Sequence, residues 1–500
     1  MKNMLPISLW ISKQILKNWK KISFSYILSI YLQFVRIDSK TKFFYGMGFI
    51  SVGIKDILYA VFVFFYFSQI LGLDQIYTGT ATLIALLFDA VSDPIIGTIS
   101  DNYKSKKYGR RHPFMAMSAI PLGISTYLLF KPFDDLGQFE LFLWMTFFSI
   151  LIRFFLSLFL VPGMSLGAEL SSDYDERTVI TSYRIMFATL ISPFVSFFGL
   201  VYFFVPEDGM STGLLNIDAY PKFAMFCALI MISTILLSVY GTKHTIPKLP
   251  KMHKKESLKS LFKNITTAYK MKSFKSLVLF TMMIYIALGI GNSLITYFLS
   301  FFFELNQTEV AVIIFSGAIG GVISLFAAPK MGKKFDKKTG VIISTFLFGL
   351  FMASPFNLRI FGLFPENGDP LLLGTYLFFT TIAYVFLWTS MSLVNSMMAD
   401  VVDEYESITN QRHEGLFFST MSFAYKLTVG LGYFFAGILL KLISFPTQTE
   451  IQNIPTEIIS KLGLIGGPLL MIIYFFSILF ILKYPIDKQK YLEIRKKLNR

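Results

Sequence analysis

The sequence contains very little cysteine and histidine. Only one of its 500 residues is cysteine and only four are histidine. Cys227 stands alone inside an apolar run, so no disulfide bond within the chain is possible. The four histidines do not have the spacing of a metal site or of a nucleophile–base pair. The sequence therefore disfavours an enzyme, and it indicates no metal centre and no cofactor.

Long polar stretches are also scarce. Hydrophobic residues make up 54% of the chain and include 56 phenylalanines. About 20 consecutive apolar residues let a helix cross about 30 Å of hydrocarbon, and the runs here lack the short alternation of a membrane barrel. We therefore predict an all-α integral membrane protein. Its twelve expected spans are residues 43–72, 79–100, 114–131, 140–167, 183–206, 222–242, 275–304, 309–329, 340–358, 371–399, 415–443 and 463–483.

Basic residues outnumber acidic ones, and the formal net charge is +15. Lysine and arginine gather in alternate loops, at residues 104–111, 243–275, 333–338 and 488–500. Such alternation is the positive-inside pattern, which places both ends of the array of spans in the cytoplasm. We expect a multi-pass protein of a bacterial-type inner (plasma) membrane. We expect its basic residues to lie next to the lipid bilayer, and we expect no nucleic acid as a partner.

The spans divide into two groups of six. The longest polar segment, residues 244–273, separates them, and short loops echo each other in the two groups. "GTISDNYKSKKYGRRHP" follows the second span and "APKMGKKFDKKTG" follows the eighth, each with an acidic residue before basic ones. Two homologous six-helix halves are the major facilitator architecture. We predict halves at 41–243 and 274–483, joined by the cytoplasmic linker 244–273.

The two ends of the chain lie outside these halves. Residues 1–40 begin with a basic, amphipathic stretch, which favours an interfacial helix on the cytoplasmic face. An upstream translation start that the mature protein does not use is the alternative. Residues 484–500 are rich in lysine and arginine and are expected to form a cytoplasmic tail.

Ionisable residues occur inside several expected spans. In "FDAVSDPIIG", Asp89 and Asp93 are four residues apart and share one helix face. A charge in a span costs at least about 2.5–3.5 kcal/mol on insertion scales. Two adjacent carboxylates repel each other, so either a cation lies between them or one holds a proton. Both outcomes predict a cation site; the alternative is purely structural pairing with Lys55 or Lys426.

Four further charged residues in spans have alternative roles. Lys55 and Asp56 are sequence neighbours, so we expect them to point to different sides of their helix and not to pair. We expect Asp56 either to accept hydrogen bonds from substrate hydroxyls or to form a structural salt bridge with Arg184 or Lys426. We expect Lys426 either to bind substrate or to act as a tethered counterion of the aspartates. Arg153 is interpreted as a structural or snorkelling residue.

Charged clusters recur at matching inner ends of the two halves. Ion pairs between them would close the cytoplasmic side when the carrier faces outward, whereas solvated loops are the alternative. The predicted gate residues are Asp101, Arg110, Arg111, Glu169, Arg177, Asp400, Asp403, Glu406, Arg412 and Glu414.

Four stretches carry a resemblance to a known family. They are "KDILYAVFVFFYFSQILGL", "FDAVSDPIIGTISD", "GAELSSDYDERTVITSYR" and "ADVVDEYESITNQRHEGLFFSTMSFAYK". From about Lys40 onward the chain resembles the glycoside–pentoside–hexuronide:cation symporters, the family of the bacterial melibiose permease. The resemblance implies Na⁺- or H⁺-coupled symport of a sugar or glycoside by alternating access. A monomer with a small-molecule substrate and a coupling cation is expected.

The resemblance also implies residue roles. It places the cation at Asp89 and Asp93, with Ser92 where a melibiose-type carrier has an amide. It implies substrate contact at Asp56 and Arg184. The residues expected to support sugar or cation binding are Lys55, Lys426 and Ser422.

The chain departs from the melibiose-type pattern at positions that grip sugar. The fourth-span acid is replaced by Leu160, although Ser157 nearby can supply an oxygen ligand. One sugar-stacking tryptophan is replaced by Met164. The other aligns near Met391, with Trp388 about one turn away. These replacements weaken the sugar assignment, and they weaken sodium relative to a proton.

A second substrate class fits these departures. Sodium-dependent lysophospholipid carriers resemble the chain in the second-span aspartates and the eleventh-span lysine, and they lack the sugar-specific residues. Methionine and phenylalanine at the cavity positions suit an apolar tail. A sodium-coupled symporter of a lysophospholipid or other amphipathic solute is therefore the alternative.

Overall fold

The computed structural model describes residues 37–103, 105, 108–171, 173–207, 210, 212–248, 270–410, 414–449 and 453–498. Three expectations lie outside these residues: the interfacial helix at the start of the chain, most of the linker 244–273, and Arg412.

Helices account for the regular structure of the described residues. The first span combines α3 (Ser39–Met47), α4 (Ile50–Ile57) and the π-helical segments η1 (Leu58–Val63) and η2 (Tyr66–Ile70). The rest of the first half comprises α5 (Gln75–Asn102), α6 (His112–Leu129), α7 (Gln138–Leu170), α8 (Tyr174–Tyr202), η3 (Gly213–Leu215), α9 (Ala219–Thr242) and η4 (Lys243–Lys248). The second half comprises α11 (Lys272–Tyr297), η5 (Phe298–Phe302), α12 (Gln307–Lys334), α13 (Lys337–Ile360), α14 (Leu371–Thr409), α15 (Glu414–Leu442), α16 (Thr456–Leu464), η7 (Ile465–Leu469), α17 (Leu470–Ile481) and α18 (Lys488–Lys497).

The all-α membrane fold predicted from the apolar runs is confirmed. Among the described residues, eleven helical segments are long and apolar enough to cross a membrane. The remaining predicted span corresponds to α6, an 18-residue helix that packs against α7 and α9. The exposed face of α6 is apolar, with Met117, Ile120 and Ile124 each more than half exposed, as expected of a helix that faces lipid.

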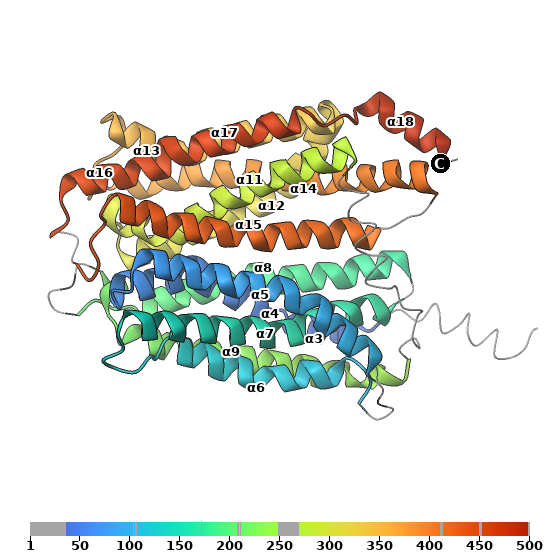
Figure 1. Cartoon of the computed structure of the whole chain (residues 1–500), viewed down its shortest axis with the longest axis horizontal. Helices are drawn as coiled ribbons and strands as arrows, with labels where there is room; N and C mark the ends of the chain where they lie inside the picture. Colours follow the sequence, from blue (N-terminus) through green and yellow to red (C-terminus); the bar gives the residue numbers. More distant parts are fainter. Residues whose placement is uncertain are drawn as a thin grey trace, which may run out of the picture.

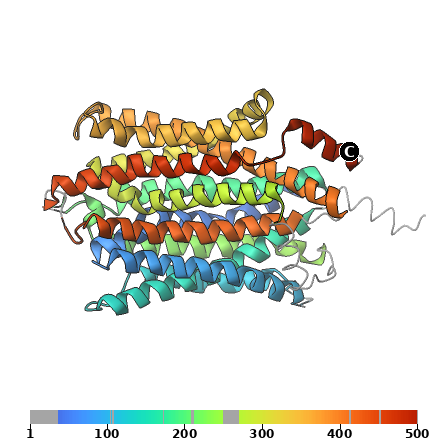
Figure 2. The same ribbon diagram turned by 45° about the horizontal axis from the view of Figure 1, so that its top comes forward.

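The helices form two bundles that lie side by side (Figures 1 and 2). In Figure 1, α3 to α9 occupy the lower part of the molecule and α11 to α18 the upper part. The contact between the bundles is made chiefly by α5 against α15 and by α8 against α12. The functional residues on α5 and α15 therefore lie at the seam between the halves.

The two halves repeat each other locally. In both, the first span ends in a π-helical segment, and the next helix follows after a short turn. That helix begins at a polar N-cap, Asp74 in the first half and Asn306 in the second, and runs for 28 residues. The side chains of these caps accept hydrogen bonds from backbone N–H groups of the first turn, as helix N-termini require. The repeat supports a duplicated architecture, whereas the exact boundaries of the halves stay a prediction.

The two ends of the bundle differ. We call the end at which α5, α7 and α14 finish the basic end, and the other the opposite end. At the opposite end and toward the middle, hydrogen bonds join the halves directly. They run from Gln75 to the carbonyl of Phe445 (3.0 Å), from Gln69 to that of Thr449 (3.2 Å), from Thr296 to that of Val61 (2.7 Å), from Tyr433 to that of Tyr59 (3.1 Å) and from Tyr297 to Ser68 (2.8 Å). The structure is therefore closed at the opposite end.

Candidate functional site

Two carboxylates, one hydroxyl and one ammonium meet at the seam. Asp89 and Asp93 lie on consecutive turns of α5. The Oγ of Ser157, on α7, lies 2.9 Å from Oδ1 of Asp89 and 2.5 Å from Oδ1 of Asp93. The Nζ of Lys426, on α15, lies 2.9 Å and 2.5 Å from the two Oδ2 atoms. The lysine ammonium thus occupies the position between the carboxylates in which the sequence predicts a cation.

Ser92 is not brought to these carboxylates. Its hydroxyl donates a hydrogen bond to the carbonyl of Asp89 at 3.2 Å, within its own helix. Its side chain lines a separate cavity of about 240 Å³ beside apolar residues of α5, α6 and α7, among them Phe88, Phe114 and Phe154. The structure therefore offers Ser157, and not Ser92, as the hydroxyl ligand beside the two aspartates.

Arg153 supplies a second positive charge. Its Nη1 lies 3.6 Å from Oδ2 of Asp89, and its guanidinium stands over the ring of Tyr59 at 4.9 Å from the centroid. Only 5% of the residue is exposed, so the snorkelling interpretation is wrong. Two internal cations thus balance two carboxylates. Of the alternatives from the sequence, the structure shows the pairing with Lys426 and not with Lys55.

Lys55 and Asp56 correct an expectation. Although they are sequence neighbours, Lys55 Nζ forms an ion pair with Asp56 Oδ1, because the long lysine stem bends back along the helix surface. Asp56 pairs with neither Arg184 nor Lys426 among the described contacts. Its side chain is 59% exposed near the middle of a span. A carboxylate that faces hydrocarbon is costly, so we expect this face of α4 to meet water.

The other predicted substrate residues are dispersed. Arg184, on α8, stands over the ring of Phe49 at 5.8 Å from the centroid. Ser422 is exposed one turn before Lys426. Trp388 donates from Nε1 to the carbonyl of Gly317 at 3.2 Å, which ties α14 to α12. The described side chains therefore do not show these three residues converging on the aspartates.

The positions at which the chain departs from sugar carriers differ in exposure. Leu160 is partly buried and packs against the core, as does Met391. Met164 is 45% exposed and Trp388 is 43% exposed. An exposed methionine on α7, on the turn after Leu160, presents an apolar and adaptable surface.

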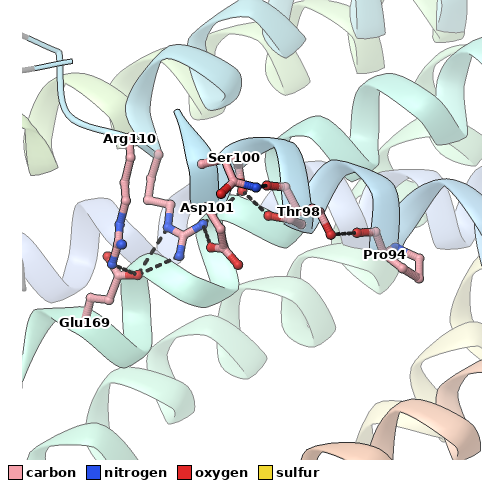
Figure 3. Close-up of polar contacts among 9 residues, drawn as sticks. Pro94, Thr98, Ser100, Asp101, Arg110 and Glu169 are labelled. Atoms are coloured by element: carbon pink, nitrogen blue, oxygen red, sulfur yellow. Dashed lines mark hydrogen bonds and ion pairs between the residues drawn. The ribbon is translucent and has the colours of Figure 1, made fainter. Parts of the chain in front are cut away.

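Four of the five predicted gate residues of the first half, Asp101, Arg110, Arg111 and Glu169, form one network at the basic end (Figure 3). Arg110 and Arg111 both contact Oε1 of Glu169, at 2.8 Å and 2.7 Å. Arg111 also lies 2.5 Å from Asp101 Oδ1, and donates to Ser100 at 2.9 Å. The network ties the end of α5 and the following loop to the end of α7. It therefore braces the first half internally.

The second half is braced separately. Asp400, on α14, pairs with Lys337, at the start of α13, at 2.7 Å. Asp403, Glu406 and Glu414 lie at the same end, and Arg177 of the first half donates to the carbonyl of Ser171 at 2.6 Å. The ion pairs seen between described residues at the basic end each join two residues of the same half. Closure of this end by pairs between the halves stays a prediction.

The comparisons with known proteins agree with this arrangement. The family model described as MFS/sugar transport protein matches residues 44–488. The chain belongs to this family. It is therefore a transporter of the major facilitator superfamily and not an enzyme, as predicted.

Three relatives of this family member span most of its length. The uncharacterised symporter YjmB of Bacillus subtilis is 24% identical and covers 88% of the chain and 89% of its own length. The isoprimeverose transporter of Lactiplantibacillus pentosus is 23% identical, with 80% and 79% covered. The sodium-dependent lysophosphatidylcholine symporter 1-B of Danio rerio is 24% identical, with 93% and 90% covered.

Solved structures support the fold. The nucleoside transporter NupG aligns with a TM-score of 0.60 at 14% identity, over 90% of this chain and 100% of that one. A D-xylose–proton symporter aligns with a TM-score of 0.56 at 15% identity, over 93% and 99%. At such identities the likeness concerns the fold alone.

Proposed function

We propose that the protein is a cation-coupled symporter of a small, carbohydrate-type solute that works by alternating access. One observation carries the proposal: the Lys426 ammonium bridges Asp89 and Asp93 across the seam between the halves. An internal cation in the place of the coupling ion links occupancy of the site to the contact between the halves.

Charge balance explains why binding of the coupling cation requires the release of Lys426. Asp89, Asp93, Arg153 and Lys426 together carry no net charge, and the pair Lys55–Asp56 is also neutral. In the low-dielectric interior an additional Na⁺ or H⁺ is costly unless a positive charge leaves. Lys426 is the charge that leaves, because its flexible stem reaches the site from the other half. Its release breaks the bridge and frees the halves to rock.

Orientation follows from the basic loops. We infer that the basic end faces the cytoplasm of a bacterial-type plasma membrane. The structure, closed at the opposite end, then represents an inward-facing state. The networks around Glu169 and Asp400 lie at the cytoplasmic end, where the gate residues would meet in the outward-facing state. A monomer without a cofactor other than the coupling ion suffices for this cycle.

Several features support a carbohydrate-type substrate. The family is described as MFS/sugar transport protein, and one relative, which covers 80% of the chain, is an isoprimeverose transporter. Asp56 offers an exposed carboxylate for sugar hydroxyls, which are good donors to an ionised acceptor. Trp388 and Ser422 are exposed on helices of the second half.

A lysophospholipid-type solute is the second candidate. A sodium-dependent lysophosphatidylcholine symporter covers 93% of the chain. Leu160 and the exposed Met164 leave the fourth long span, α7, without the acid and the aromatic ring that sugars require.

Uptake into proteoliposomes tests the proposal. Galactosides, xylosides, glucuronides and a lysophospholipid are supplied separately, each with an inward Na⁺ gradient, an inward H⁺ gradient or no gradient. We expect accumulation of a glycoside only with one of the gradients. Accumulation of the lysophospholipid alone would favour the second candidate. Gradient-independent equilibration of every solute would overturn cation coupling.

A further inference from the structure

Arg153 is a buried charge to which the cycle above gives no task of its own. Among the described residues its one ion pair is with Asp89, at 3.6 Å. Its Nε is buried and has no hydrogen-bond partner. The hydroxyls of Tyr59 and Ser149 are also buried, and Ser149 precedes Arg153 by one helical turn. A buried polar group without a hydrogen-bond partner costs free energy of folding. We therefore infer that the site needs a positive charge at the position of Arg153.

The two aspartates differ in their surroundings. Asp89 faces both Arg153 and Lys426 as well as the Ser157 hydroxyl that it shares with Asp93, and its side chain is 13% exposed. Asp93 has Lys426 and Ser157 as its partners, and its side chain is 25% exposed. When Lys426 leaves, Asp89 keeps a counter-charge and Asp93 does not. The incoming cation is therefore required at Asp93.

We propose that Arg153 is a positioning residue that holds Asp89 ionised as a fixed pair, and that Asp93 alone exchanges Lys426 for one monovalent coupling cation. This assignment rests on the proposed function and adds to it a division of labour between Asp89, whose counter-charge is fixed, and Asp93, whose counter-charge is exchanged. Because Arg153 is sealed by the ring of Tyr59, it stays in place while the less deeply buried Lys426 moves. The free Nε gives Arg153 the capacity to hold Asp89 more closely after Lys426 has left.

No other charged group among the described neighbours replaces Arg153 in this role. From α4, Lys55 faces the site but is neutralised by Asp56. From η1 and α15, Tyr59, Tyr425 and Tyr433 approach, and tyrosine is neutral at physiological pH. From α15, Lys426 is the exchangeable charge itself. Among the described neighbours of Asp89, Arg153 is therefore the one fixed and unneutralised positive charge.

The assignment is tested by removing the positive charge of Arg153, the negative charge of Asp89, or both. If the two residues form a fixed pair, removing both should restore the cation affinity that each single change alters. The full-length protein is purified in detergent, and the thermal unfolding midpoint is followed while Na⁺ replaces choline and, separately, while the pH is lowered. Removing Arg153 leaves one excess negative charge, so R153Q should bind Na⁺ or H⁺ at least about tenfold more tightly. D89N leaves one excess positive charge, so this variant should bind Na⁺ or H⁺ at least about tenfold more weakly than the wild type. The double variant R153Q/D89N should return toward the wild type.

The controls separate charge from folding. R153K keeps the charge and should remain close to the wild type, and R359Q removes a distant arginine and should not shift the cation dependence. R153Q/D93N should show no cation dependence at all. Rescue of R153Q by D93N in place of D89N, or R153K behaving as R153Q does, would overturn the assignment. An unresponsive wild type that also shows no gradient-driven uptake would instead overturn the proposed function, and the assignment with it.

Discussion

Two aspartate–lysine bridges join the same pair of helices, α5 and α15, in very different surroundings. The central bridge joins Asp89 and Asp93 to Lys426, and the outer bridge joins Asp74 to Lys441 at 2.5 Å. In each helix the two bridge positions are 15 residues apart, Asp74 to Asp89 and Lys426 to Lys441. At 1.5 Å per residue the bridges lie about 22 Å apart along antiparallel helices.

The two bridges differ in how far their side chains are exposed. The side chains of Asp89 and Lys426 are 13% and 14% exposed, whereas those of Asp74 and Lys441 are 27% and 55% exposed. Breaking a buried pair by removing one partner costs about 3–5 kcal/mol, but an exposed pair contributes about 0–1 kcal/mol. The same residue types thus make a buried bridge near the middle of the helices, to which we assign the coupling role, and a weaker, exposed bridge at their ends.

The largest expected effect is on the central bridge. In the proposed cycle Asp93 exchanges Lys426 for the cation, so D93N should abolish gradient-driven accumulation while exchange without a gradient persists. Proteoliposome uptake of the solute found in the panel measures both. Intact accumulation by D93N would show that the central bridge is only structural.

The lysine side of the central bridge should affect stability. K426Q leaves two carboxylates with Arg153 alone, so the free energy of unfolding near neutral pH should fall by about 3–5 kcal/mol. Added Na⁺ or acid should restore most of it, because either neutralises the excess charge. Denaturant unfolding in detergent measures this, with K426R as the charge-preserving control. A loss that neither Na⁺ nor acid restores would contradict the charge argument.

Packing next to the outer bridge should set which end is open. A Cβ on Gly437 would lie 2.1 Å from the carbonyl oxygen of Gln75, so G437A should push α15 from α5 at the opposite end. We expect faster labelling of a cysteine introduced at Thr449 by a membrane-impermeant maleimide, in a C227S background. G374A, where a Cβ meets nothing within 4 Å, is the matched control. Equal labelling rates would show that this contact does not hold the end closed.

The smallest expected effect is on the outer bridge itself. Partial burial opposes ionisation of Asp74, but the Lys441 ammonium and the Ile76 N–H outweigh it and hold the pKa of Asp74 below its ordinary value. Its stabilisation is therefore present above that ordinary value and is lost as the pH falls through the lowered pKa. D74N should cost less than about 1 kcal/mol and should remove this acid-dependent loss.

A titration of thermal unfolding midpoints for D74N and the wild type, at low and high salt, measures this difference. The difference should shrink at high salt, because exposed pairs are screened. A cost as large as that of K426Q would erase the contrast between the two bridges.

The sequence predicted the features that depend on local spacing. The lengths of the apolar runs predict the spans, and the interval of four residues between Asp89 and Asp93 predicts a shared helix face. The sequence also contained an unused signal, the equal spacing of the two bridges on α5 and α15. By contrast, local spacing misled at Lys55 and Asp56, because a lysine stem is long enough to reach its own neighbour.

The sequence alone therefore determined that the protein is a helical membrane carrier and that two carboxylates share one face of a membrane-spanning helix. Tertiary structure alone decided which cations meet them. Lys426 lies 333 residues from Asp93 and Arg153 lies 64 residues from Asp89 along the chain, and only helix packing brings them within a few ångströms. Hydrophobicity and helical periodicity act over neighbouring residues, whereas charge balance in a membrane is set by whichever helices pack together.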